Sequence, residues 1–181
     1  MSLKAQIDAY NVQKDAKLPA DVLALMNTTN EELIAQHIKD NALQIGQKVE
    51  NFSLANHNGE NIELADLLKK GPIIISFYRG GWCPYCNLEL KALNDYLPQF
   101  KTQSAQLIAI SPQLPDETLS TAQKNDLEFD VLCDVSNKVA EQLVCCLHLM
   151  SVFKRYIHNL VLILNTTTAI KALNYRYRPP M

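Results

Sequence analysis

Apolar residues recur with helical spacing over residues 3–41, on both sides of Leu18-Pro19. The positions that share a helical face are Leu3, Ile7 and Tyr10 before the proline, and Val22, Leu23 and Met26 after it. Thr29 and Glu32 have the spacing of a capping box, which predicts that a third helical segment begins at Thr29. We therefore predict a helical arm over residues 1–44 that packs on the rest of the chain or on a second subunit.

Beyond this arm, short apolar runs alternate with helix-forming segments. Asn58-Gly59 predicts the turn of a hairpin. Ile73 to Tyr78 is a nearly continuous apolar run, as expected for a strand in the middle of a sheet that is covered on both faces. The pattern predicts further strands over 106–111 and 129–133, with helices from the residues after Cys86 to near Pro98, from Asp116 or Ser120 to about Asn125, and from Asp134 or Ser136 through Val144. This alternation predicts an α/β three-layer sandwich whose sheet is at least partly parallel.

The last part of the chain, residues 145–181, differs in composition from the part that precedes it. All 19 acidic residues lie before residue 142, whereas residues 142–181 include five bases and no acid. Strands over 159–164 and 169–173 fit the pattern, but the turn between them lacks the glycine that hairpins usually contain. We treat this segment as a divergent tail.

Composition and charge narrow the class of protein. Apolar residues make up 48% of the 181 residues, which is enough for a packed core, and the net charge of −2 argues against a nucleic-acid-binding surface. The N-terminal segment lacks the apolar core of a signal peptide, and no apolar window is long enough to cross a bilayer. The five cysteines form no regular framework of a disulfide-rich secreted domain. We therefore expect a cytoplasmic protein without membrane or nucleic-acid partners and without a cofactor.

The chemistry that the sequence offers is concentrated in a Cys-x-x-Cys pair, Cys83 and Cys86, at a predicted strand-to-helix junction. The first turn of a helix favours a thiolate through its free N–H groups and the positive end of its dipole, and two cysteines at this spacing can close a disulfide. The alternative is half of a zinc site, for which two more ligands would have to come from Cys133, Cys145, Cys146 and His148. These residues form no second ligand motif, so we favour a redox pair without a metal.

The residues around the pair supply candidate supporting groups. Arg79 is a candidate for stabilising a thiolate, or else a surface residue without a functional role. Trp82 is either a docking platform for a partner or a packing residue, and Tyr78 completes the supporting set. Gly80-Gly81 is too short for a phosphate-binding loop and fits a tight turn into the helix.

The phrase Ser-Phe-Tyr-Arg-Gly-Gly-Trp-Cys-Pro-Tyr-Cys-Asn-Leu-Glu-Leu at 76–90, with Ala109-Ile110-Ser111-Pro112 and the segment 129–134, resembles the peroxiredoxin-like members of the alkyl hydroperoxide reductase/thiol-specific antioxidant (AhpC/TSA) family. The resemblance runs to about residue 142. It implies a thioredoxin-like fold over residues 45–144, after the arm and before the tail. It also implies reduction of hydrogen peroxide or organic hydroperoxides through a sulfenic acid and then a Cys83–Cys86 disulfide, with electrons from thioredoxin or a similar dithiol. A homodimer is a further expectation.

The order in which the two sulfurs act stays open at this level. The family pattern Pro-x-x-x-Thr-x-x-Cys, placed on this chain, makes Cys86 the attacking residue, with Arg79 at the proline position and Cys83 at the threonine position. A thioredoxin-type interpretation of Trp82 to Cys86 makes Cys83 the exposed nucleophile and Cys86 its resolving partner. We favour Cys83, because it lies nearest the helix end.

The tail departs from the family. A complete thioredoxin fold continues through a cis-proline that faces the two cysteines, yet no proline stands between Pro115 and Pro179. Arg155 and Arg176 do not match the family's second arginine by motif. A frame-shifted or degenerate tail would explain these departures and would call activity into question. An inactive relative that acts as a binding partner is therefore kept as an alternative. Among enzymes, the alternative is a thioredoxin-like protein disulfide reductase.

Overall fold

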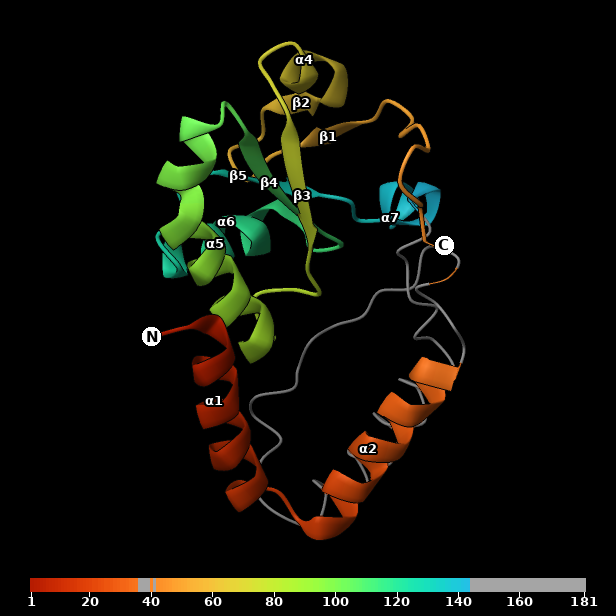
Figure 1. The fold of residues 1–181 in the computed structure, drawn as a ribbon, viewed down its shortest axis with the longest axis vertical. Coiled ribbons are helices and arrows are strands. Elements are labelled where there is room, and N and C mark those ends of the chain that lie inside the picture. The colour runs from red at the N-terminus through yellow and green to blue at the C-terminus, as the bar shows by residue number, and fades with distance from the viewer. Residues whose placement is uncertain (36–39, 41, 144–181) are drawn as a thin grey trace. The chain divides into compact units, whose positions relative to one another are not determined.

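The computed structural model describes residues 1–35, 40 and 42–143, and Figure 1 traces their elements. The helices are α1 (Leu3–Lys17), α2 (Ala20–Ala35), α4 (Leu64–Leu68), α5 (Pro84–Thr102), α6 (Pro115–Lys124) and α7 (Lys138–Gln142), and the strands are β1 (Ser53–Ala55), β2 (Asn61–Glu63), β3 (Ile73–Phe77), β4 (Gln106–Ser111) and β5 (Asp130–Cys133). Residues 1–16 form one compact unit with the described residues from 42 to 143, and α2 belongs to a second unit. The described residues that form the candidate site lie in the first unit.

The centre of this unit is a parallel sheet with the strand order β3-β4-β5. Helix α5 connects β3 to β4, and α6 connects β4 to β5, so each connection is a βαβ crossover. The predicted alternation of strands and helices is therefore confirmed, and with it the α/β class. Within the described residues, however, β3 pairs only with β4, and its residues are only partly buried. The central strand of this part of the sheet is β4, five of whose six residues are buried.

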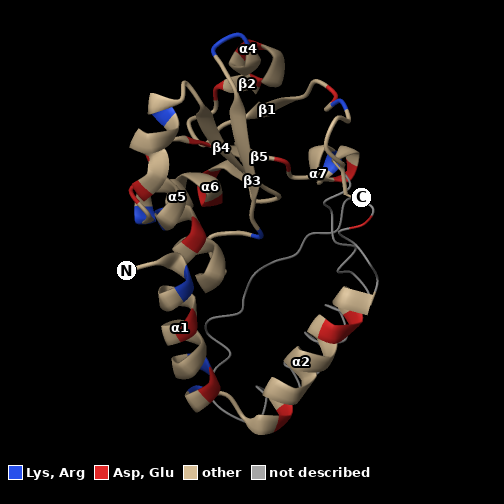
Figure 2. Ribbon diagram, viewed as in Figure 1, with Lys and Arg blue, Asp and Glu red and all other residues tan. Residues whose placement is uncertain are grey.

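Two hydrophobic clusters lie on opposite faces of the sheet, because successive side chains of β4 point to opposite sides. Leu107 and Ala109 belong to the cluster under α5 and α6, whereas Ile108 and Ile110 belong to the cluster under α4, α7 and the hairpin. Figure 1 shows the same arrangement of layers around the three strands. In Figure 2, β3 and β4 carry no charged position, and the charges lie mainly on the helices and connections. The predicted three-layer sandwich is thus confirmed for this unit.

The predicted hairpin is confirmed, and one buried side chain organises its turn. Strands β1 and β2 pair antiparallel around Asn56 to Gly59. Asn56 is fully buried. Its Oδ1 accepts from the backbone N–H groups of Asn58 and Glu60, while its Nδ2 donates to Asp130 Oδ1 at 2.8 Å. This last bond ties the hairpin to the start of β5.

Two predicted boundaries are wrong. Helix α2 runs without interruption past Thr29, because no proline or glycine in its sequence breaks the helix there, and Thr29 does not begin a third segment. Helix α5 continues through Pro98 to Thr102. The proline costs this helix one backbone hydrogen bond, and the apolar contacts of Leu97 and Phe100 hold the helix on both sides of it.

The last helix was predicted to begin at Asp134 or Ser136, but it begins at Lys138, and Asp134 still binds its first turn. The buried Asp134 carboxylate accepts from the N–H groups of Val139 and Ala140, both at 3.0 Å, although the residue in the N-cap position is Asn137. The predicted extension of this helix to Val144 lies outside the described residues. So do the strands predicted over 159–164 and 169–173, the cysteines at 145 and 146, and the tail as a whole. Among the helices described, none combines the length and the apolar character that crossing a membrane would require.

Candidate redox site

The site forms where the chain leaves β3 and enters α5. Residues 78–82 cross the carboxyl edge of the sheet, and Pro84 takes the first position of the helix, where its missing N–H costs nothing. Cys83 is therefore the N-cap residue, with φ −88° and ψ 114°. Its extended backbone turns the side chain back toward the first turn of α5, where the helix offers unpaired N–H groups.

The Cys83 sulfur accepts two hydrogen bonds, one from a backbone N–H and one from a side chain. The backbone N–H of Cys86 donates to Cys83 Sγ at 3.4 Å, and Arg79 Nη2 donates to the same sulfur at 3.1 Å. Both cysteines are free thiols, so the structure represents the reduced pair. Cys83 is fully buried and Cys86 is 8% exposed, so the sulfur that was expected to be exposed is covered in this state.

These contacts shift the pKa values of the two thiols in opposite directions. The adjacent Cys86 thiol, the Cys86 N–H and the Arg79 guanidinium lower the pKa of Cys83 to about 5, although burial opposes them. The hydrogen bond between the two side chains, together with burial, raises the pKa of Cys86 above its ordinary value. At neutral pH the arrangement thus places a thiolate on Cys83 and keeps a thiol on Cys86, which is the charge state that a nucleophile and its resolving partner require.

Arg79 links the Cys83 sulfur to the only tryptophan of the chain. Its guanidinium carbon lies 5.2 Å from the centre of the Trp82 ring, and its Nη2 contacts Cys83. Trp82 itself is 53% exposed. The structure therefore brings Arg79, Trp82 and Cys83 together, as a layer that runs from the buried sulfur to the surface.

The glycines of the connection permit close packing on both sides. A Cβ added to Gly80 would collide with the Trp82 ring, and one added to Gly81 would collide with Thr121 Oγ1 of α6. Gly80 also adopts φ +150°, which other residues rarely do. The tight turn expected from the sequence is present, and it seats the connection directly on α6.

Tyr78 lies deeper, in the cluster that also contains the two cysteines. Burial raises the pKa of Tyr78, which the nearby Ser111 and Thr121 partly oppose, and among the described residues its hydroxyl forms no hydrogen bond of good geometry. Cys133 is buried at the end of β5, where its Sγ donates to Thr118 Oγ1 at 3.3 Å. Of the residues considered as zinc ligands beside the pair, the cysteines at 145 and 146 and the histidine at 148 lie outside the described residues.

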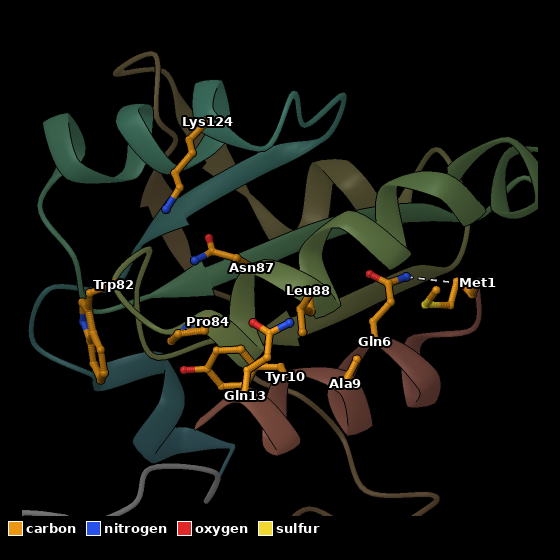
Figure 3. Close-up of a pocket in the computed structure, with 10 residues that line it drawn as sticks. All are labelled: Met1, Gln6, Ala9, Tyr10, Gln13, Trp82, Pro84, Asn87, Leu88 and Lys124. Atoms are coloured by element: carbon orange, nitrogen blue, oxygen red, sulfur yellow. Dashed lines mark hydrogen bonds between the residues drawn. The ribbon is translucent and has the colours of Figure 1, made fainter. Parts of the chain in front are cut away.

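Helix α1 contacts Tyr85, one of the two residues between the cysteines. Tyr85 Oη donates to Asn11 Oδ1 at 2.6 Å, and the rings of Tyr10 and Tyr85 meet edge to face with centroids 5.0 Å apart. A hollow of about 510 Å³ lies beside this contact. Figure 3 shows the residues that line it, which come from the N-terminal segment with α1, from the start of α5 and the connection before it, and from α6. Its lining residues are Met1, Gln6, Ala9, Tyr10, Gln13, Trp82, Pro84, Asn87, Leu88 and Lys124.

Several groups around the site were not anticipated from the sequence. Asn87 follows the motif directly and lies four residues after Cys83, a helical spacing that could have suggested its contact with the loop. Three further residues contact the connection before α5 or Asn87: Gln113, Thr121 and Asn125. They come from a distant part of the chain, and nothing in the sequence around them indicates these contacts. Only the fold brings them to the cysteines.

Comparison with known proteins connects this site to one family. A sequence model of the AhpC/TSA family matches residues 45–158, which extends beyond the resemblance expected from the sequence and leaves the helical arm outside. Thiol-disulfide oxidoreductase ResA of Bacillus cereus is 35% identical over 102 residues, covering 54% of this chain and 56% of the relative. Peroxiredoxin Bcp of Escherichia coli is 28% identical over 102 residues, covering 56% and 65%. The chain thus spans less than two thirds of the length of these relatives.

Solved structures lead to the same fold. Peroxidoxin BcpB of Mycobacterium tuberculosis has a TM-score of 0.53 and 26% identity, over 54% of this chain and 64% of that one. A yeast mitochondrial 1-Cys peroxiredoxin has a TM-score of 0.52 and 21% identity, over 55% and 49%, which bears on the fold alone. The thioredoxin-like class predicted for the domain is therefore confirmed.

Proposed function

The chain belongs to the AhpC/TSA family, and from this premise we propose that it is a thiol peroxidase that reduces hydrogen peroxide or organic hydroperoxides. The observation that carries the proposal is the unequal pair of thiols. Cys83, with its pKa lowered to about 5, is the nucleophile, and Cys86, with its pKa raised, holds a proton until it is needed. The relative named a peroxiredoxin supports the choice of peroxide as the substrate.

In the proposed reaction the Cys83 thiolate attacks one oxygen of the peroxide. An S–O bond forms as the O–O bond breaks, and the leaving alkoxide or hydroxide takes a proton from water. The sulfur is now a sulfenic acid. Cys86 then attacks this sulfur, releasing water and closing the Cys83–Cys86 disulfide, and an external dithiol of the thioredoxin type reduces the disulfide by exchange.

Arg79 has a defined task in this scheme. Its guanidinium contacts the Cys83 sulfur at 3.1 Å and favours the thiolate over the thiol. Its stacking on Trp82 limits the directions that the guanidinium can take. Tyr78 forms part of the wall behind the cysteines, and we retain it as a supporting residue.

The test is to treat the reduced protein with peroxide, count the free thiols and map the disulfide. We expect loss of two thiols and a bond between Cys83 and Cys86, whereas an unchanged count would overturn the proposal. The order of attack is tested with Cys86→Ser and Cys83→Ser and a sulfenic-acid trap. Trapping on Cys83 in the first variant supports our assignment, and trapping on Cys86 in the second would reverse it.

A second candidate is a protein disulfide reductase, which the relative named a thiol-disulfide oxidoreductase favours. In that reaction the Cys83 thiolate attacks a substrate disulfide, and Cys86 resolves the mixed disulfide. Peroxide consumption measured beside the reduction of insulin disulfides separates the two activities. Turnover in either assay would exclude the inactive binding partner.

We also propose the setting in which this chemistry occurs. A reducing cytoplasm would keep the pair in the thiol state, and no nucleic acid or membrane takes part. We retain the division into an arm over 1–44, a domain over 45–144 and a tail over 145–181, and a homodimer as the assembly. Analytical ultracentrifugation tests the dimer, and a monomer at micromolar concentration would contradict it.

A further inference from the structure

The connection that carries Cys83 is held by side-chain amides from other elements. Asn87 Nδ2, on the first turns of α5, donates to the carbonyl oxygens of Gly81 at 2.8 Å and of Cys83 at 3.0 Å. The N–H of Gly81 donates to Gln113 Oε1 at 2.7 Å. Both polar backbone groups of Gly81 therefore have side-chain partners, and the carbonyl of Cys83 accepts from the side chain as well as from the backbone N–H of Asn87.

A second amide fixes the direction of the first. Asn125 Nδ2 donates to Asn87 Oδ1 at 2.9 Å and to the carbonyl of Thr121, also at 2.9 Å. Since the Asn87 oxygen accepts this bond, its NH₂ group must face the two carbonyls, which can only accept. Asn125 is the C-cap residue of α6 and is 4% exposed, so the chain of amides is anchored at the buried end of that helix.

The direction of the Cys83 side chain depends on this backbone. Cys83 is outside the helix, and its sulfur meets the Cys86 N–H and Arg79 only in the extended conformation that the N-cap residue adopts. A rotation of the Gly81–Cys83 peptide groups would turn the sulfur away from both donors. The peptide groups that would have to rotate are those whose carbonyls Asn87 holds.

We propose that Asn87, oriented by Asn125, is a positioning residue that fixes the peptide groups of Gly81 and Cys83 and so keeps the Cys83 sulfur directed at the first turn of α5. Neither asparagine contacts the sulfur, so both act through the backbone. The role rests on the proposed function only in assigning the nucleophile to Cys83.

The test replaces Asn87 by a residue of similar volume that cannot donate, Asn87→Leu. Because the peptide groups of Gly81 and Cys83 then lose their side-chain donor, the sulfur is less firmly directed at the Cys86 N–H and Arg79. We therefore expect the midpoint of the pH profile for alkylation of Cys83 by iodoacetamide to rise by about one pH unit. Mass spectrometry follows the modification at Cys83 alone, without any peroxide. The dithiol–disulfide potential, measured against glutathione, should shift as well.

The matched control is Asn94→Leu on the same helix. Asn94 bridges α5 to the segment after α6 in the same manner, with Nδ2 donating to the Asp126 carbonyl and Oδ1 accepting from the Glu128 N–H, but it does not touch the cysteine loop. The control should lose stability and keep the wild-type alkylation profile. An Asn87→Leu profile equal to that of the control would reduce Asn87 to a structural residue and overturn the proposal.

Asn125→Leu provides a second test of the proposal, which can be used if Asn87→Leu does not fold. This variant leaves Asn87 in place but removes the donor that orients it, so a smaller shift in the same direction is expected, and the double variant should shift less than the sum of the two. An unchanged profile in folded Asn125→Leu would contradict the proposal. Because no peroxide is present, a protein without peroxidase turnover would refute the proposed function while leaving this result intact.

Discussion

At the scale of single residues, the proposed role of Cys83 as the nucleophile depends on the negative charge of its sulfur. Alkylation by iodoacetamide follows the thiolate fraction. Because the pKa of Cys83 is lowered to about 5, we expect its alkylation rate to fall to half near pH 5 and to be nearly constant above neutral pH. The profile of a thiol with an ordinary pKa would instead still be rising at pH 8.

Cys133 is the internal reference for that measurement. Burial raises its pKa, so its modification should require alkaline pH and should remain slow. Cys83→Ser should abolish the component with the acidic midpoint and leave Cys133 unchanged. A half-maximal rate for Cys83 between pH 8 and 9 would contradict the assignment of the thiolate.

A second prediction at this scale concerns Arg79. Arg79→Met keeps much of the side-chain volume but removes the donor and the positive charge beside Cys83 Sγ. The alkylation midpoint should rise by about one pH unit, at the low end for a nearby charge because the arginine is partly solvated. Trp82→Phe keeps an aromatic face for the guanidinium, so its midpoint should stay near the wild-type value; a larger shift in Trp82→Phe than in Arg79→Met would count against the role of Arg79.

At the scale of elements, the connection between β3 and α5 is seated directly on α6. Gly81→Ala would drive its new Cβ into Thr121 Oγ1. We expect a loss of about 1–3 kcal/mol in the free energy of unfolding, as for other overpacked sites. Urea denaturation followed by far-UV circular dichroism measures it.

Thr121→Ala supplies the complementary change. It removes the hydroxyl and methyl groups that the new Cβ would meet, so Gly81→Ala combined with Thr121→Ala should recover part of the loss. Thr121→Ala alone gives the baseline for the cycle. Additive losses in the double variant would show that the two positions do not clash.

Elements with strong local signals were predictable, and those that depend on tertiary contacts were not. The apolar run at 73–77 and the Asn-Gly turn identified β3 and the hairpin, because burial and turn geometry are encoded nearby. The continuation of α5 past Pro98 depends on packing that no local rule contains. In the same way, Cys83, Cys86 and Arg79 could be chosen from one segment, whereas the contact of Gln113 with that segment arises only when β4 pairs with β3.

At the scale of the whole molecule, the described sheet separates two hydrophobic clusters that share β4 and β5. Leu90 is fully buried in the cluster under α5, and Leu132 is fully buried in the cluster on the other face. Leu90→Ala and Leu132→Ala should each lower the free energy of unfolding by about 2–5 kcal/mol. Because both clusters depend on the same strands, each variant should still unfold in a single transition.

Coincident urea transitions in far-UV and near-UV circular dichroism test this cooperativity. Leu68→Ala is the control, since Leu68 is 55% exposed on α4 and its loss should change stability by about 0.5 kcal/mol or less. Separate transitions for the two probes in either core variant would mean that the faces of the sheet fold independently.

The position of Trp82 has a practical consequence. It is the only indole in the chain, it precedes the reactive sulfur by one residue, and a guanidinium lies against its ring. All tryptophan emission of the protein therefore originates beside Cys83. In the proposed reaction, closing the disulfide would remove the negative charge of the Cys83 sulfur, with which Arg79 pairs. Trp82 would then serve as an optical indicator of oxidation, and stopped-flow fluorescence could follow a single turnover without any added label.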